Sequence, residues 1–154
     1  MMDGCVVCQM LKKEVCPPGG VIYENETWLL AHSLPPVFIP GKLTLKLKRH
    51  RENLSELSTQ ESVALGPLIQ RVCQVLQRVT RAEKVHVASY GEGISHVHFL
   101  ITPRTENLPA SNIQLTFWLL WRRGLYQLRN RGVVFGDGDV IEICDQIRQA
   151  LMVG

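Results

Sequence analysis

Residues 94–104 read Ile-Ser-His-Val-His-Phe-Leu-Ile-Thr-Pro-Arg and are the most informative stretch of the chain. Apolar residues alternate with His96 and His98, a period of two that predicts a strand. Residues two positions apart in a strand project from the same face, so His96 and His98 are expected to lie side by side. Two imidazoles on one face can ligate one metal ion or serve as one ligand beside one nucleophile. From spacing alone, two ordinary histidines on an amphipathic strand are an equally good interpretation.

The rest of the pattern surrounds this strand with further strands and one long helix. Ser58 and Glu61 have the spacing of a capping box, and apolar residues follow at helical intervals as far as Val79. Strict alternation over 42–48 predicts a strand whose lysine-bearing face is exposed to solvent. Further strands are expected at 21–23, 28–32, 84–89 and 96–103, and further helices at 114–126 and 141–152. Because strands and helices do not alternate regularly, the order favours an α+β fold.

The composition is typical of one globular domain. The chain has 154 residues, 45% of them hydrophobic and 20% charged, which excludes a disordered tail, a coiled coil and a collagen-like chain. The formal net charge is only +3, so a nucleic-acid function would need a clustered basic patch. With no recognisable signal peptide or membrane-spanning run, a cytoplasmic protein is expected. An odd number of cysteines, five, argues against a complete set of disulfides within the chain.

Cys5 and Cys8 are the closely spaced cysteine pair. A gap of two residues lets both thiolates reach one tetrahedral ion, although a lone pair of this kind is weak evidence and also fits a redox pair. The flanking sequence lacks the strand and helix that surround a thioredoxin-like motif. With His50 and His96 added, the pair becomes a candidate Cys2His2 set drawn from three distant segments.

Taken in order, these features resemble the histidine triad (HIT) superfamily, which also contains galactose-1-phosphate uridylyltransferase. The resemblance extends from about residue 4 to residue 104. It rests on Cys5-Val6-Val7-Cys8, Val21-Ile22-Tyr23-Glu24-Asn25 with Trp28, Pro40-Gly41-Lys42-Leu43, Lys48-Arg49-His50 with Glu52, and His96-Val97-His98 leading into Pro103-Arg104. It implies a HIT-like antiparallel sheet packed with helices, usually as a homodimer, and a nucleotide cleft beside the histidine strand. A HIT-like domain is thus expected at 1–104, with a helical C-terminal extension at 105–154 packed on the same domain.

The resemblance also implies roles for individual residues. Family members with both cysteines hold zinc through four side chains, which correspond here to Cys5, Cys8, His50 and His96. Four protein ligands leave no open position, so the zinc is expected to be structural. The second strand histidine is the family's nucleophile and corresponds to His98, whose attack on a nucleotide α-phosphate would form a covalent nucleotidyl-histidine.

The chain departs from the family where the third motif residue should stand. The family has histidine or glutamine there, and this chain has Leu100, which offers the phosphate neither a donor nor an acceptor. By analogy with oxyanion holes, losing one such donor costs about 10²–10³ in rate. Just before His96, Glu92 and Gly93 also replace residues that are common in the family.

Two functions of different classes therefore stay open. The first is a HIT-like nucleotide hydrolase or nucleotidyl transferase. The alternative is a catalytically weakened zinc domain that binds a nucleotide or a protein partner without turnover. A nucleotide or dinucleoside polyphosphate is the expected small-molecule partner, and no membrane partner is expected. A nucleic-acid-binding zinc module, suggested only by basic residues at 42–51 and 122–131, is a third and weaker alternative.

Overall fold

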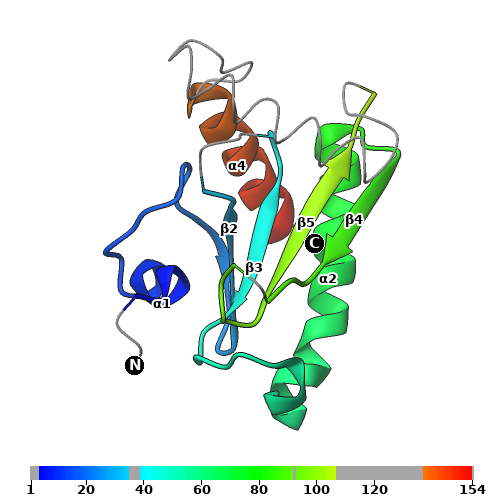
Figure 1. Cartoon of the computed structure of the whole chain (residues 1–154). Coiled ribbons are helices and arrows are strands. Elements are labelled where there is room, and N and C mark those ends of the chain that lie inside the picture. Colours follow the sequence, from blue (N-terminus) through cyan, green and yellow to red (C-terminus); the bar gives the residue numbers. More distant parts are fainter. Residues whose placement is uncertain (1–3, 35–38, 92, 107–136, 154) are drawn as a thin grey trace.

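The computed structural model describes residues 4–34, 39–91, 93–106 and 137–153. In these residues, five strands form one antiparallel sheet in the order β1-β2-β3-β5-β4 (Figure 1). The strands are β1 (Val21–Glu24), β2 (Trp28–His32), β3 (Leu43–Leu47), β4 (Lys84–Ala88) and β5 (His98–Arg104). The helices are α1 (Val6–Leu11), α2 (Thr59–Thr80) and α4 (Asp137–Met152), with a 3-10 turn η1 at Leu54–Glu56. The expected α+β class is confirmed.

Alternation along the strands gives the sheet two different faces. Trp28 and Leu30 of β2 point into the main core, which the sheet shares with α2 and α4 (Figure 1). Leu29 and Ala31 point the opposite way and pack against Met10 of α1. The two long helices therefore cover one face, and α1 covers part of the other face over β2.

The start of α2 follows the sequence closely. The Ser58 hydroxyl accepts a hydrogen bond from the Glu61 backbone N–H at 3.2 Å, and a Glu61 carboxylate oxygen accepts from the Ser58 N–H at 2.7 Å. This reciprocal arrangement is the predicted capping box. The helix then continues through Pro67 to Thr80.

The solvent-exposed face expected for the strand at 42–48 is a wrong prediction. Every residue of β3 is buried, including Thr44 and Lys46, with 7% and 3% of their surface exposed. β3 is the central strand of the sheet. A period of two indicates that one face is polar, but it does not distinguish a polar face in water from a buried polar site.

Some element boundaries also differ from those expected. β5 begins at His98, so His96 lies in a bend before the strand rather than within it. Helix α4 begins at Asp137, earlier than expected, and contacts α2 and β1. The helix expected at 114–126 lies outside the described residues, and the division into 1–104 and 105–154 stays a prediction. Within the described ranges, no helix combines the length and apolarity needed to cross a membrane.

Candidate metal centre and histidine site

Three segments far apart in the sequence bring two cysteines and two histidines together. Cys5 is the residue that precedes α1, and Cys8 lies in the first turn of that helix. His50 follows β3, and His96 precedes β5. One potential ligand atom from each of the four lies within 4.8 Å of all the others. The sequence had no pattern that predicted α1, the short helix that presents both thiols.

The spacing of these atoms fits a tetrahedral ion. Ligands at about 2.3 Å for sulfur and about 2.0 Å for nitrogen are set about 3.3–3.8 Å apart around such an ion. The Cys5 Sγ lies 3.4 Å from Nδ1 of His96, and the Cys8 Sγ lies 3.8 Å from the same atom. The Cys8 Sγ lies 3.3 Å from Nδ1 of His50, and the two Nδ1 atoms are 3.1 Å apart. These four distances lie in or close to that range, so the four residues could hold a metal ion.

Protonation at the cluster also suits metal binding. Nε2 of His96 lies 2.7 Å from the Leu47 carbonyl, so a hydrogen on Nε2 is donated there and Nδ1 keeps its lone pair. Burial lowers the pKa of His96, which favours the neutral imidazole that metals bind. Burial, with the neighbouring Cys5 as a further cause, raises the pKa of the Cys8 thiol. The thiolate form of Cys8 would therefore need a nearby positive charge to stabilise it, and a metal ion would supply that charge.

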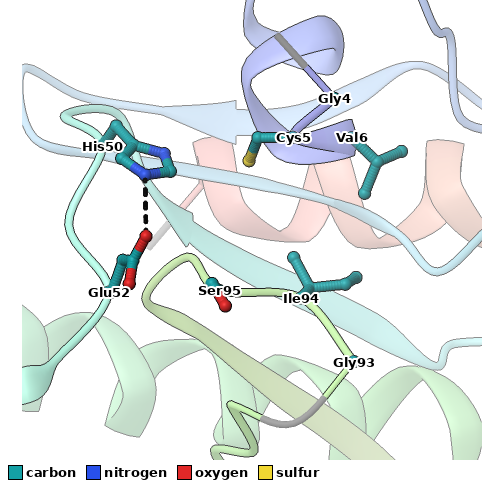
Figure 2. A pocket seen from close by; sticks show the side chains of 8 residues that line it. All are labelled: Gly4, Cys5, Val6, His50, Glu52, Gly93, Ile94 and Ser95. Carbon is teal, nitrogen blue, oxygen red and sulfur yellow. Dashed lines mark ion pairs between the residues drawn. The ribbon is translucent and has the colours of Figure 1, made fainter. Parts of the chain in front are cut away.

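His50 has one buried nitrogen that points to the same conclusion. Its Nε2 is buried and has no hydrogen-bond partner among the described residues, and a carboxylate oxygen of Glu52 lies 3.7 Å away (Figure 2). If Nδ1 binds a metal, Nε2 carries the hydrogen and faces this carboxylate. Carboxylates in this position orient histidine ligands and increase their basicity.

A charged pair attaches the segment that bears His50 to helix α2. Arg49 donates two hydrogen bonds to the carboxylate of Glu61, at 2.9 Å and 2.7 Å. The hydrogen bonds from Arg49 are the main cause that lowers the pKa of Glu61 to about 2. Burial acts in the opposite direction, and the hydrogen bonds with Ser58 lower the pKa further. Trp28 Nε1 donates to the Glu61 carbonyl at 3.2 Å. Glu61 thus connects the capping box, the core and the candidate metal centre.

A cavity of about 470 Å³ opens beside the cluster. Figure 2 shows Cys5 and His50 at its wall, together with the loop that precedes His96. The lining residues are Gly4, Cys5, Val6, His50, Glu52, Gly93, Ile94 and Ser95. This opening gives an ion a path from solvent to Cys5 and His50.

His98 lies at the start of β5 and is buried, with 6% of its surface exposed. Its Nδ1 lies 2.6 Å from the carbonyl of His96. A hydrogen on Nδ1 is donated to that carbonyl, which leaves the lone pair of the neutral imidazole on Nε2. This is the tautomer that a histidine nucleophile requires.

Leu100 lies two residues further along β5, where it is paired with Thr44 of β3 and Ala88 of β4. The same antiparallel register pairs His98 with Lys46. Burial lowers the pKa of Lys46 to about 7. The alternating pattern of 42–48 predicted that Lys46 lies on a solvent-exposed face. It could not predict that Lys46 lies next to His98, because that neighbourhood arises only from the pairing of β3 with β5.

The structure resembles solved histidine triad proteins over almost its whole length. A Hit-like protein from Bartonella henselae, described as involved in cell-cycle regulation, matches with a TM-score of 0.70 and 17% identity over 97% of this chain and 98% of its own. A hypothetical histidine triad nucleotide-binding protein from Sulfolobus tokodaii matches with a TM-score of 0.71 and 17% identity, over 97% and 93%. A zinc-bound histidine triad family protein from Mycobacterium smegmatis matches with a TM-score of 0.67 and 18% identity, over 97% and 94%.

No family model matches the sequence, and no curated protein matches it. The chain nevertheless has the fold of the histidine triad proteins, together with a cluster of two cysteines and two histidines that can hold a metal ion. The resemblance inferred from the sequence is thereby confirmed at the level of the fold.

Proposed function

We propose that this chain is a HIT-like nucleotide hydrolase or nucleotidyl transferase, with His98 as its nucleophile. The observation that carries the proposal is the hydrogen bond from His98 Nδ1 to the His96 carbonyl, which directs a free Nε2 lone pair away from the backbone. The nucleotide-binding description of the Sulfolobus tokodaii protein supports a nucleotide as the substrate. Nucleoside phosphoramidates and dinucleoside polyphosphates carry an α-phosphate with a leaving group, and they are the substrate class that we propose.

The proposed reaction consists of two displacements at phosphorus. In the first displacement, His98 Nε2 attacks the α-phosphorus and a P–N bond forms. The bond between phosphorus and the leaving group breaks, and its electron pair goes to the leaving group, which takes up a proton. Water or another acceptor then attacks the same phosphorus, and the P–N bond breaks. The acceptor's proton is lost and the imidazole returns to its starting state.

We propose zinc as the metal at Cys5, Cys8, His50 and His96. The donor set and its tetrahedral spacing support this choice, as does the zinc-bound Mycobacterium smegmatis protein of the same fold. All four positions are taken by side chains, so the ion would connect α1 to the sheet and would not contact substrate. The carbonyl that accepts the hydrogen bond from His98 Nδ1 belongs to His96. An ion bound to His96 would therefore also help to fix the orientation of the His98 ring.

A second candidate function is nucleotide binding without turnover. Leu100 favours it, because this side chain gives a leaving group neither a donor nor an acceptor. The two functions differ in one measurable respect, which is the formation and breakdown of the nucleotidyl-histidine.

Turnover of adenosine 5′-phosphoramidate and of diadenosine polyphosphates by wild type and by His98→Ala tests the proposal. We expect turnover by wild type and a loss of about 10³-fold or more in the variant, the scale at which a covalent nucleophile contributes. His86→Ala is the matched control, because His86 is exposed on β4 of the same sheet. Rapid quenching should also trap an acid-labile adenylate on wild type and none on His98→Ala.

Each other result has a distinct meaning. Nucleotide binding by wild type without turnover or a trapped adenylate would establish the binding domain instead. Equal turnover by wild type and His98→Ala would overturn the assignment of the nucleophile. Absence of both binding and turnover over the whole set of nucleotides would overturn both candidate functions.

A further inference from the structure

Lys46 lies directly across from His98 on the buried polar face of the sheet. The two residues are register partners in the antiparallel pair β3–β5, so their side chains leave the same face. Lys46 has 3% of its surface exposed and His98 has 6%. The pairing of β3 with β5 thus places these two residues next to each other on the buried face.

The ammonium of Lys46 has no compensating negative charge among the described residues. Its Nζ donates to the Thr44 carbonyl at 3.2 Å, and no ion pair involves it there. Protonated lysine has three N–H donors, so two of them have no acceptor in the described part of the chain. Among the residues whose side chains are not described, the sequence holds three side-chain carboxylates, those of Asp3, Glu92 and Asp137, and none from 107 to 136.

A second surplus donor lies on the same face. The hydroxyls of Ser33 and Thr44 are 2.9 Å apart and both residues are buried. Two hydroxyls carry two hydrogens, and the contact between them uses one. The other hydrogen has no acceptor among the described residues, and Thr44 is the register partner of Leu100.

The excess of hydrogen-bond donors on this face indicates that a ligand bound there would be negatively charged. A buried ammonium with one acceptor and no counter-charge is costly, and a bound anion would offset that cost. The group that fits beside a nucleophilic histidine is an anionic, oxygen-rich one, which is the description of a phosphate. Lys46 and the hydroxyl pair border the position where Leu100 contributes no donor.

We infer that Lys46 is a substrate-contacting residue that donates to the phosphate oxygens of the bound nucleotide and supplies the contact that Leu100 lacks. The inference deepens the proposed function and rests on it. In this arrangement the phosphate contact comes from β3, across the sheet from the nucleophile, rather than from the third motif position on β5. A chain with a leucine at that position can then still bind and orient an α-phosphate.

The test compares nucleotides with nucleosides, so that it isolates the phosphate. Calorimetry measures the affinity of the four ribonucleoside 5′-monophosphates and the four matching nucleosides for wild type, Lys46→Met and Lys48→Met. Methionine keeps the apolar stem and removes the charge, and Lys48 is an exposed lysine that directly follows the same strand. We expect Lys46→Met to weaken monophosphate binding about ten- to hundred-fold, the range for charged hydrogen bonds, with nucleoside affinity changed less than about two-fold.

Folding of the variant is measured alongside binding. Lys46→Met should raise the melting temperature, because it removes a buried charge, so a loss of phosphate affinity in a more stable protein cannot come from unfolding. Lys46→Gln, which keeps a neutral donor, should lose less phosphate affinity than Lys46→Met. It also provides the same comparison if the methionine variant does not fold.

Three results would overturn the inference. If wild type prefers monophosphates and Lys46→Met keeps that preference, Lys46 does not contact the phosphate and the proposed function stands. If Lys48→Met causes an equal loss, the effect is a general one of net charge. If wild type binds none of the eight compounds, the proposed function and the role of Lys46 fall together.

Discussion

His96 and His98 are separated by a single residue, yet they belong to sites of different completeness. His96 supplies one of four potential ligand atoms that lie within 4.8 Å of one another and could hold a metal ion. His98 has its tautomer-setting hydrogen bond, but the third position on its strand is Leu100. In this chain the candidate metal ligands are all present, whereas the histidine strand lacks a polar side chain at its third position. A metal ion at this cluster would also connect α1 to the sheet, whereas the third position would bear on the proposed substrate alone.

Metal removal should have the largest effect, because it acts on the more complete of the two sites. We expect one zinc ion per chain in the purified protein, and its loss on treatment with a strong chelator or in Cys8→Ser. Structural zinc contributes several kcal/mol, and each kcal/mol shifts the melting temperature of a chain this size by about 2–4 °C. Metal analysis and thermal unfolding should therefore show a fall of about 10 °C or more.

Cys16→Ser is the control for this experiment, because Cys16 is an exposed thiol outside the cluster. It should keep both the zinc and the melting temperature. Hydrogen exchange should locate the effect, with faster exchange in α1 than in α2 after metal removal. A metal-free, equally stable wild type would contradict the assignment of a structural metal.

Leu100→Gln should have the next largest effect, because it restores a donor and an acceptor at the less complete site. With Lys46 already beside the phosphate, we expect a gain of about ten-fold in turnover, below the 10²–10³ that a lone oxyanion donor supplies. Steady-state kinetics on adenosine 5′-phosphoramidate provide the measurement. Leu100→Met, of similar size and without a strong hydrogen-bonding group, should leave turnover unchanged. A drop in turnover with Leu100→Gln would mean that the leucine is required for substrate packing.

Glu61→Gln should have the smallest effect on metal binding and turnover, since it changes the support of the His50 segment and neither site directly. The folded-state pKa of Glu61 is lowered from 4.5 to about 2, so its stabilisation is fully present above about 4.5 and is lost as pH falls toward 2. At pH 7 the variant should be less stable by about 1–3 kcal/mol, the cost of weakening buried, charged hydrogen bonds.

Denaturant unfolding at several pH values measures this difference between wild type and Glu61→Gln. The difference should shrink below pH 4.5 and disappear near pH 2. Glu83→Gln is the control, because Glu83 is exposed and its contact with Arg104 is a long 3.9 Å. A difference that stays constant from pH 7 to pH 3 would mean that the Arg49–Glu61 pair is not its source.

Much of the fold was predictable because its signals are local. Ser58 and Glu61 specify the start of α2 through hydrogen bonds within one turn, and the alternating leucines of β3 specify a strand. The two-residue gap between Cys5 and Cys8 likewise suggests a shared ion through spacing alone. Helix α1 was not predictable in this way, because its six residues are too few to form a helix without the contacts that Val7, Cys8 and Met10 make when buried.

The sequence by itself predicted the strands and the long helix, because these depend on residue type and short-range spacing. The four candidate metal ligands and the candidate nucleophile came from the resemblance of the ordered motifs to the histidine triad superfamily. Tertiary structure alone decided that Lys46 is buried and paired with His98, and that His96 turns its Nδ1 toward Cys5 and Cys8. The reason is physical: pairing between β3 and β5 joins residues about fifty positions apart, and no local pattern carries the register of such a pair.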